Sequence, residues 1–213
     1  MRKTFLAITL FLAFSKAALA QFGNCTASEM RTYVDSATGN TITMLTDTMK
    51  NDRFLYQTDP MWTADGKYLL FRSSSRGNDK EVESTLPNGE KRKWTPTQIY
   101  FIEMATGKII QATEGPNLGS AFLANKTNRM FVSRKEKENW NMYVMDLNKF
   151  FADVKQGKVG KPSAYETFIG TFPTEMGRPG GYAVDCNDDY AYITVEREGT
   201  EEEKERMMKN AFL

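Results

Sequence analysis

The fold is decided by the stretch Pro60-Met61-Trp62-Thr63-Ala64-Asp65-Gly66-Lys67-Tyr68-Leu69-Leu70-Phe71. A short apolar segment runs into a polar Asp-Gly turn, and an aromatic and aliphatic run leaves it, which indicates two antiparallel strands. The same pattern returns at residues 120–132 and again at residues 181–193, with the three turns near residues 65, 127 and 188. A unit of strand, polar turn and strand therefore recurs at a spacing of about sixty residues, which indicates an internal repeat.

A second hairpin lies between the first two copies. Residues 98–103 form one β-rich run, the turn Ala105-Thr106-Gly107 follows, and residues 108–113 form another run. Two hairpins per unit make a four-stranded antiparallel sheet, which is the blade of a β-propeller. We interpret two stretches, 78–96 and 150–162, as insertions that lengthen the repeat.

The fold class predicted from these strands is all-β: an incomplete β-propeller of four-stranded antiparallel blades, with about three blades in this chain. Known propellers need about four to eight blades to close, so we expect a fragment, a truncated product or a half that associates with something. An open array exposes sheet edges, and association through those edges is expected. A β-sandwich with irregular loops is the alternative fold.

The composition excludes several classes of protein. The chain has 213 residues, with Lys+Arg 28, Asp+Glu 27 and no histidine. This balance is typical of a folded soluble chain and excludes a strongly basic nucleic-acid binder. Without histidine, a Ser-His-Asp triad, an imidazole base or a His-ligated metal site cannot be built from these residues alone. The two cysteines, Cys25 and Cys186, are too few for a disulfide scaffold, and two free thiols are favoured over a pair.

The first twenty residues are typical of a secretory signal. A positive start, Met1-Arg2-Lys3, precedes an apolar run at residues 4–14, and Ala18-Leu19-Ala20 fits a cleavage site. The run is too short to span a bilayer stably, although an N-terminal membrane anchor is the alternative. We therefore predict a periplasmic or secreted protein without a stable membrane anchor. Its parts are a signal peptide at 1–20, an N-terminal leader at 21–40 and a partial propeller at 41–213.

The opening of the predicted mature chain resembles the oligogalacturonate lyase family. Residues 31–47 match a segment with the pattern D-x-x-T-G followed by L-T, and then come Tyr56, Asp59-Pro60 and the Trp62-Thr63-Ala64-Asp65-Gly66 hairpin in the same order. The hairpin at residues 99–115 is similar to one that this family shares with the wider group of TolB-like propellers, so it indicates fold more than function. The resemblance covers about residues 31–200 and only the front part of a full-length member.

The resemblance implies a chemistry and also what this chain lacks. Members of the family cleave short pectin fragments by β-elimination: a base removes the proton next to the uronate carboxylate, and the bond to the neighbouring sugar breaks. The carboxylate must be neutralised by metal ions or by Arg and Lys as charge develops. The resemblance implies a histidine base and a manganese-type site in later blades, so no catalytic or metal-binding residue is assigned here. We expect this chain alone to be inactive, although Lys or Arg can act as the base in other lyases.

What remains for this chain is positioning of an oligouronate substrate. Four arginines in turns or at strand ends are the substrate-binding candidates: Arg72, Arg76, Arg134 and Arg178. Their guanidinium forks suit a carboxylated sugar, but an exposed arginine without a ligand is the favoured alternative for each, since most arginines lie on the surface. Tyr56 and Trp62 are aromatic side chains suited to stacking on a sugar or to packing in the core.

Two further functions fit the same repeats. A TolB-like propeller that binds protein partners and catalyses nothing is the main alternative. The non-catalytic propeller of a serine peptidase is another, and it would need a hydrolase domain downstream.

Overall fold

The computed structural model describes residues 21–77, 80–85, 89–172 and 179–195. The predicted signal peptide at residues 1–20 therefore lies outside the described residues. In the described part the chain is all-β apart from one α-helix and one short 3-10 helix, which confirms the predicted fold class at that level. No helix there is long and apolar enough to cross a membrane. Cys25 and Cys186 are exposed free thiols.

The first large sheet has five antiparallel strands in the order β1-β9-β8-β5-β4. Their bounds are β4 Asp52–Arg53, β5 Tyr68–Ser73, β8 Gln98–Glu103, β9 Ile109–Gln111 and β1 Cys25–Thr26. Strand β5 follows the Asp65-Gly66 turn, where Gly66 has a φ of 68°. That conformation favours glycine, and the Asp65 carboxylate fixes the turn by accepting a hydrogen bond from the Lys67 N–H at 3.1 Å. Strand β1 lies within residues 21–40, which we predicted from the sequence to be an N-terminal leader.

The second large sheet has four antiparallel strands in the order β10-β11-β12-β13. Their bounds are β10 Leu118–Leu123, β11 Arg129–Glu136, β12 Asn139–Asp146 and β13 Glu166–Thr171. Helix α1 (Leu147–Gln156) and the 3-10 helix η1 (Pro162–Ala164) connect β12 to β13.

Helix α1 occupies most of the stretch that we interpreted as an insertion. The side chain of Asp146 caps its first turn by accepting from the Lys149 N–H at 3.0 Å. The apolar face of the helix buries Phe150 and Phe151, and the Phe151 ring stacks on Tyr68 of the first sheet with centroids 3.6 Å apart. The insertion is therefore part of the core.

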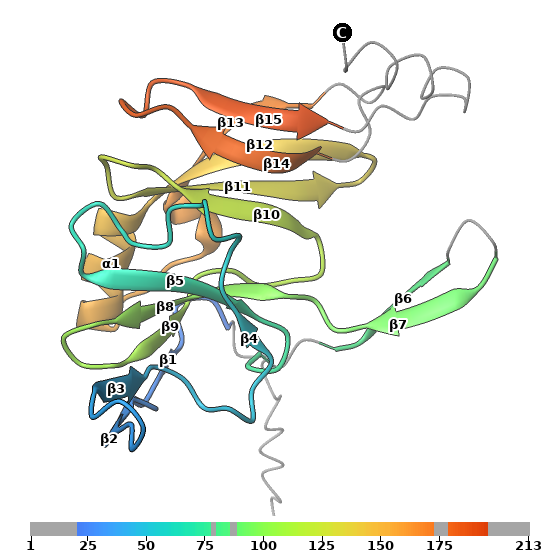
Figure 1. Cartoon of the computed structure of the whole chain (residues 1–213). Helices are drawn as coiled ribbons and strands as arrows, with labels where there is room; N and C mark the ends of the chain where they lie inside the picture. Colours follow the sequence, from blue (N-terminus) through green and yellow to red (C-terminus); the bar gives the residue numbers. More distant parts are fainter. Residues whose placement is uncertain (1–20, 78–79, 86–88, 173–178, 196–213) are drawn as a thin grey trace, which may run out of the picture.

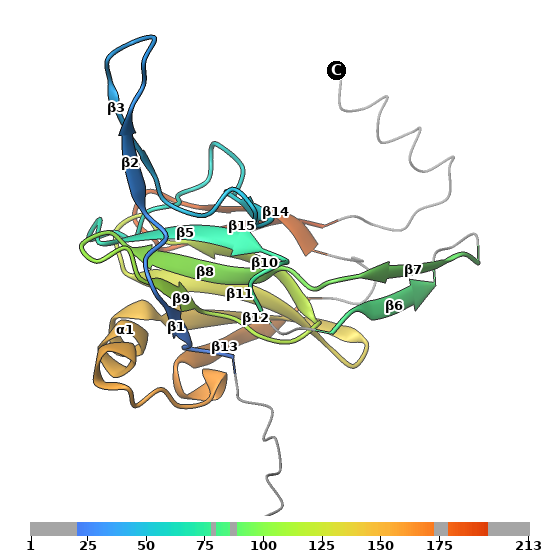
Figure 2. The same cartoon turned by 90° about the horizontal axis from the view of Figure 1, so that it is seen from below.

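Three two-stranded hairpins complete the described structure. They are β2 with β3 (Arg31–Val34, Thr41–Met44), β6 with β7 (Val82–Thr85, Lys91–Trp94) and β14 with β15 (Pro179–Val184, Ala191–Val195). Figures 1 and 2 show the β6–β7 hairpin projecting from the body of the molecule, in the other predicted insertion.

The sheets are stacked in layers, with β14–β15 at one end and β2–β3 at the other (Figure 1). The main core lies between the first and second sheets and beneath α1, and includes Leu70, Phe101 and Met130. A second core on the far face of the first sheet packs against Leu45, just after β3. A third core joins the second sheet to β14–β15 through Tyr182. The first and last layers are therefore hairpins, and complete sheets lie between them.

The predicted repeat is present as three hairpins of the same form. Thr63, Ala124 and Asp185 each donate a backbone N–H to a carbonyl five residues later, at 3.0 Å in every case. These three positions are 61 residues apart, which agrees with the spacing predicted from the sequence. No sheet closes on itself in the described part of the chain.

Candidate functional site

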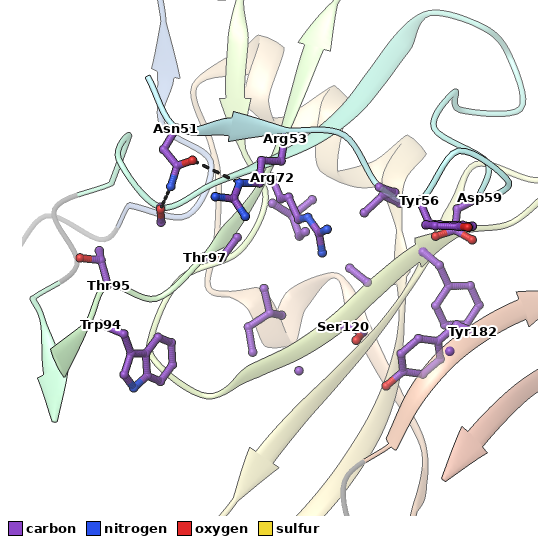
Figure 3. A pocket seen from close by; sticks show the side chains of 18 of the residues that line it. Asn51, Arg53, Tyr56, Asp59, Arg72, Trp94, Thr95, Thr97, Ser120 and Tyr182 are labelled. Atoms are coloured by element: carbon purple, nitrogen blue, oxygen red, sulfur yellow. Dashed lines mark hydrogen bonds between the residues drawn. The ribbon is translucent and has the colours of Figure 1, made fainter. Parts of the chain in front are cut away.

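A cleft of about 800 Å³ opens where the first strands of successive sheets meet. Strand β4 and the segment after it line one wall, β10 lines the floor, and Gly181 and Tyr182 of β14 close the far side (Figure 3). Strand β7 and the residues after it contribute Arg92, Trp94 and Thr97. The repeat thus places the beginning of each unit at one common cavity.

Three arginines give the cleft its positive charge: Arg53, Arg72 and Arg92. Arg53 and Arg72 are exposed and lie directly opposite each other in the β4–β5 register. The Arg53 Nε–H donates to Asn51 Oδ1 at 3.2 Å, and the Asn51 amide donates to Ser74 Oγ at 2.7 Å (Figure 3). Like charges directly opposite each other destabilise a sheet, so an anion bound between the two guanidinium groups would reduce their repulsion.

The carboxylates around the cleft do not neutralise these arginines. Among the described residues that line it, Asp59 is the sole carboxylate. No ion pair involves Arg53, Arg72 or Arg92 within the described part of the chain. The cleft therefore has a surplus of guanidinium groups, each of which presents several donors to an anion.

Aromatic side chains accompany the arginines. Figure 3 shows Trp94 and Tyr56 on opposite sides of Arg53 and Arg72, and both rings are exposed. Tyr182 is held more firmly, because its ring stacks on Phe122 at 4.8 Å and its hydroxyl lies 2.8 Å from Ser133 Oγ. Exposed aromatic faces beside hydrogen-bond donors are suited to sugar rings, whose C–H faces are apolar and whose edges are polar. Trp62 does not line the cleft, and it forms a bridge with Leu69 on the adjoining strand.

Arg76 forms ion pairs with two carboxylates outside the cleft. Its Nη2 lies 2.6 Å from Glu29 Oε2 and 2.5 Å from Asp52 Oδ2, and its side chain is 6% exposed. Burial opposes its charged form, but the hydrogen bonds that it donates to Asp52 and Glu29 outweigh this and raise the pKa of Arg76. The hydrogen bonds that Arg76 donates in turn lower the pKa of Glu29. Because Glu29 Oε2 also accepts from the Asp47 N–H at 2.8 Å, this cluster ties the base of the β2–β3 hairpin to β4.

Arg134 is likewise engaged away from the cleft. It forms a two-pronged ion pair with the buried carboxylate of Glu166, and its Nη2 lies 2.5 Å from Oε1. Its guanidinium also lies over the Tyr143 ring at 5.8 Å. Arg178 lies outside the described residues. Of the four arginines predicted from the sequence, the structure therefore brings Arg72 into the cleft, where Arg53 and Arg92 join it.

Sequence reasoning did not select Arg53 and Arg92. Strand β4 is two residues long, so it has no alternating pattern to reveal Arg53. Arg92 lies in a stretch we interpreted as an insertion, and only the folded hairpin brings it to the cleft. The one available signal was the charge of the Lys91-Arg92-Lys93-Trp94 run with its aromatic end.

The described part of the chain offers no ligand set for a metal ion. No group of three or more Asp, Glu or Cys side chains there is placed to hold a metal ion. The manganese-type site implied by the resemblance therefore finds no ligand set in the described part of the chain.

The fold resembles those of two solved oligogalacturonate lyases. One is an oligogalacturonate lyase in complex with manganese, with 20% sequence identity and a TM-score of 0.53. The other is an oligogalacturonate lyase from Vibrio parahaemolyticus, with 21% identity and a TM-score of 0.52. Each match covers 78% of this chain and 35% of the solved chain, so this chain spans about a third of their length. At this identity the likeness concerns the fold, and it agrees with the resemblance expected from the sequence.

Comparison of the sequence alone gave no further relatives. No protein family profile matches the chain, and no curated protein matches it.

Proposed function

We propose that this chain is the substrate-positioning front part of a secreted or periplasmic oligogalacturonate lyase-like propeller. The observation that carries the proposal is the cleft whose described lining residues include Arg53, Arg72 and Arg92, one carboxylate and two exposed aromatic rings. Its ligand is an oligouronate, whose repeating carboxylates match the guanidinium groups and whose ring faces match Trp94 and Tyr56. The likeness to solved oligogalacturonate lyases supports this choice among anionic sugars.

The architecture supports a partial propeller of about three blades. In a propeller, four-stranded blades surround a central channel. Here the cleft lies against β4, β10 and β14, which begin three successive units. A ligand site at the common beginning of several blades is the arrangement that such a channel provides. The cleft volume of about 800 Å³ falls in the range of about 300–1,000 Å³ that is usual for small-ligand sites.

The residues of the cleft indicate which part of the reaction this chain supports. The arginines neutralise the uronate carboxylate, which is the charge that must be stabilised before the neighbouring proton can be removed. Asp59, the sole carboxylate among the described lining residues, belongs to a turn in which its N–H donates to the Tyr56 carbonyl at 2.8 Å. We assign no base to this chain. It therefore binds and orients the oligouronate, and on its own it does not catalyse elimination.

Isothermal titration calorimetry tests the proposal directly. The protein is titrated with trigalacturonate and, as a neutral sugar of equal length, with maltotriose. We expect heat from the first and none from the second, and Arg72→Gln should weaken trigalacturonate binding about tenfold or more, since a hydrogen bond to a charged group is lost. Lys93→Gln is the matched control, because it removes the same charge from a residue beside Arg92 that does not line the cleft.

Three outcomes contradict the proposal. Equal binding of both sugars, or equal loss in Arg72→Gln and Lys93→Gln, would show that the cleft does not select uronates. Sustained formation of the unsaturated product by this chain alone, followed by its ultraviolet absorbance, would refute the assignment of positioning without catalysis.

A further inference from the structure

The carboxylate of Glu114 holds the backbone at the point where the predicted signal peptide joins the rest of the chain. The backbone N–H of Gln21 donates to Glu114 Oε2 at 2.9 Å, and the N–H of Phe22 donates to the same oxygen at 3.1 Å. Gln21 directly follows the sequence Ala18-Leu19-Ala20, which fits a cleavage site. Two successive backbone donors therefore converge on one carboxylate oxygen immediately after the predicted cut.

Glu114 has no cationic side chain as a partner in the described part of the chain. None of the ion pairs found there includes it. Glu114 is partly buried, and it does not line the arginine cleft. A carboxylate that is partly removed from water is stabilised most by a nearby cation that also donates a hydrogen bond. The position of the Gln21 nitrogen is therefore suited to a positive charge.

The residues that follow are held along the outer edge of the first sheet. The Gly23 N–H donates to the Gln111 carbonyl at 2.7 Å, and the Gln111 N–H donates to the Asn24 carbonyl at 2.9 Å. Strand β1 then pairs with β9 and becomes the fifth strand of the sheet (Figure 2). These backbone hydrogen bonds fix the path of the segment up to the predicted cut.

Phe22 fixes which residue lies beside Glu114. Its side chain is 5% exposed and belongs to the main core, where its ring centroid lies 5.0 Å from that of Phe150. A shift of one residue would put Gln21 or Gly23 in the place of Phe22 and lose the burial of an aromatic ring. The nitrogen that Glu114 receives is therefore specifically that of Gln21.

We propose that a signal peptidase cuts after Ala20, so that Gln21 begins the mature protein and its α-ammonium group forms an ion pair with Glu114. This inference rests on the export that is part of the proposed function. Hydrolysis of the Ala20–Gln21 peptide bond consumes one water molecule and leaves a carboxylate on Ala20 and an amino group on Gln21. An α-amino group has an ordinary pKa of about 7.7–8.0, so it takes up a proton at neutral pH.

The cut strengthens a contact that the fold already makes. Before the cut, the nitrogen of Gln21 belongs to a neutral peptide group and donates its N–H to Glu114. After the cut, the same nitrogen is an ammonium group. Coulomb attraction then adds to the hydrogen bond, and partial burial reduces the screening of that attraction by salt. Removal of the signal peptide therefore stabilises the docking of residues 21–26 on the first sheet.

Mass spectrometry of the exported protein tests the cut. The full chain is produced in a bacterium, and the processed protein is purified from outside the cytoplasm. We expect Gln21 as the first residue, with a free amino group. A different first residue would overturn the proposal. Cyclised Gln21 would also overturn it, because the amino group then attacks the side-chain amide, releases ammonia and loses its charge.

Acetylation of the amino group tests the ion pair. The processed parent and Glu114→Gln proteins are acetylated in urea at about pH 6.5, where an α-amino group reacts in preference to lysine because its pKa is lower. The acetyl group restores a neutral amide at the Gln21 nitrogen, as in the chain before the cut. All four proteins are refolded, checked by circular dichroism and unfolded in urea, which gives a double-mutant cycle.

We expect Glu114→Gln to raise the unfolding equilibrium constant about fivefold in the protein with a free amino group, and clearly less in the acetylated protein. Glu138→Gln is the control, since it removes the same charge from an exposed side chain between β11 and β12 and should have a small effect in both forms. Equal effects of Glu114→Gln in both forms would overturn the ion pair. Acetylation of the parent alone should lower its urea midpoint, so the ion pair is tested even where Glu114→Gln does not refold.

These measurements are independent of the arginine cleft. Glu114 and Gln21 do not line it, and the oligouronate titration depends on Arg72. A missing cut would contradict the export alone, whereas a failure to bind trigalacturonate would contradict the substrate alone. The two proposals therefore fail separately.

Discussion

Asp188 holds Thr127 across two successive repeats. The Thr127 backbone N–H and hydroxyl both donate to Asp188 Oδ2, at 2.8 and 2.9 Å. The N–H groups of Asn125 and Lys126 donate to the same carboxylate at 2.6 and 2.9 Å. The turn of the third hairpin therefore caps the turn of the second hairpin. Asp65 and Asn128 join the first and second turns in a similar way, with the Asp65 N–H donating to Asn128 Oδ1 at 3.2 Å.

The first prediction concerns Asp188→Asn. Asp188 has a φ of 63°, which asparagine tolerates, so the substitution removes the charge without straining the turn. We expect a loss of about 2 kcal/mol in the free energy of unfolding, because several hydrogen bonds to a buried charged acceptor are weakened. Urea denaturation measures the loss. Asp189→Asn, at an exposed neighbouring position, should change stability little, and equal losses would show that the cap contributes nothing specific.

The second prediction is a loss of stability in acid. Burial opposes ionisation of Asp188, but the N–H groups of Lys126, Asn125 and Thr127 outweigh it and lower its pKa. Burial also opposes ionisation of Asp65, but hydrogen bonds from Thr63 and Lys67 outweigh it and lower the pKa of Asp65 to about 2. A lowered folded-state pKa gives stability that is complete above the unfolded pKa of about 3.9 and is lost as pH falls through the folded value.

The measurement is urea denaturation between pH 5 and pH 2. We expect the unfolding free energy to fall below about pH 4, and Asp188→Asn to show a smaller fall than the parent because one of the responsible groups is gone. Parallel curves for the two proteins would contradict the assignment to Asp188.

The hairpins were predictable from the sequence, and the cleft was not. The copies at residues 60–71, 120–132 and 181–193 carry their strand and turn residues in the order in which they fold, so local chemistry was sufficient. Arg53 and Arg92 become neighbours of Arg72 only through a two-residue strand and a projecting hairpin. No local sequence pattern predicts that these three arginines lie close together.

The same limit explains Arg76 and Arg134, the two other predicted arginines that the structure describes. Whether a guanidinium meets a ligand or an internal carboxylate depends on residues far along the chain. Arg76 meets Glu29, which is 47 residues away, and Arg134 meets Glu166, which is 32 residues away. The Phe150-Phe151 pair of α1 lies in a stretch that we interpreted as an insertion from the sequence. Packing against Tyr68 gives that pair its role.

The third prediction concerns Arg76→Gln. The substitution leaves the largely buried carboxylates of Asp52 and Glu29 without their cation, and breaking one side of a buried pair costs about 3 kcal/mol or more. Thermal and urea unfolding should show a strong loss. Arg76→Lys should restore little of the lost stability, because an ammonium group cannot form a two-pronged contact with a carboxylate as the guanidinium fork does. Arg92→Gln is the matched control with an exposed arginine, and a similar loss there would contradict the prediction.

The fourth prediction separates stability from binding at the cleft. Arg72→Gln removes one of two like charges that lie opposite each other on β4 and β5, so we expect the ligand-free protein to gain about 0.5 kcal/mol in unfolding free energy. The same substitution should weaken binding of trigalacturonate. The gain should be largely absent when Arg53→Gln is already present, which a double-mutant cycle measures. A loss of stability in Arg72→Gln would mean that Arg72 has a structural partner instead.

The fifth prediction uses two glycines in the same kind of turn. Gly39 and Gly107 share a left-handed backbone, so alanine at either position should cost about 1 kcal/mol in strain. A Cβ at residue 39 would meet nothing within 4 Å, whereas one at residue 107 would lie 2.1 Å from Ser28 Oγ and 2.7 Å from Met30 Sδ. Gly107→Ala should therefore be clearly more destabilising than Gly39→Ala in urea unfolding. In Gly107→Ala combined with Ser28→Gly, the nearest obstacle is gone, and much of the difference between the two turns should disappear. A Gly107→Ala loss that does not exceed the Gly39→Ala loss would mean that residues 28–30 do not pack against this turn.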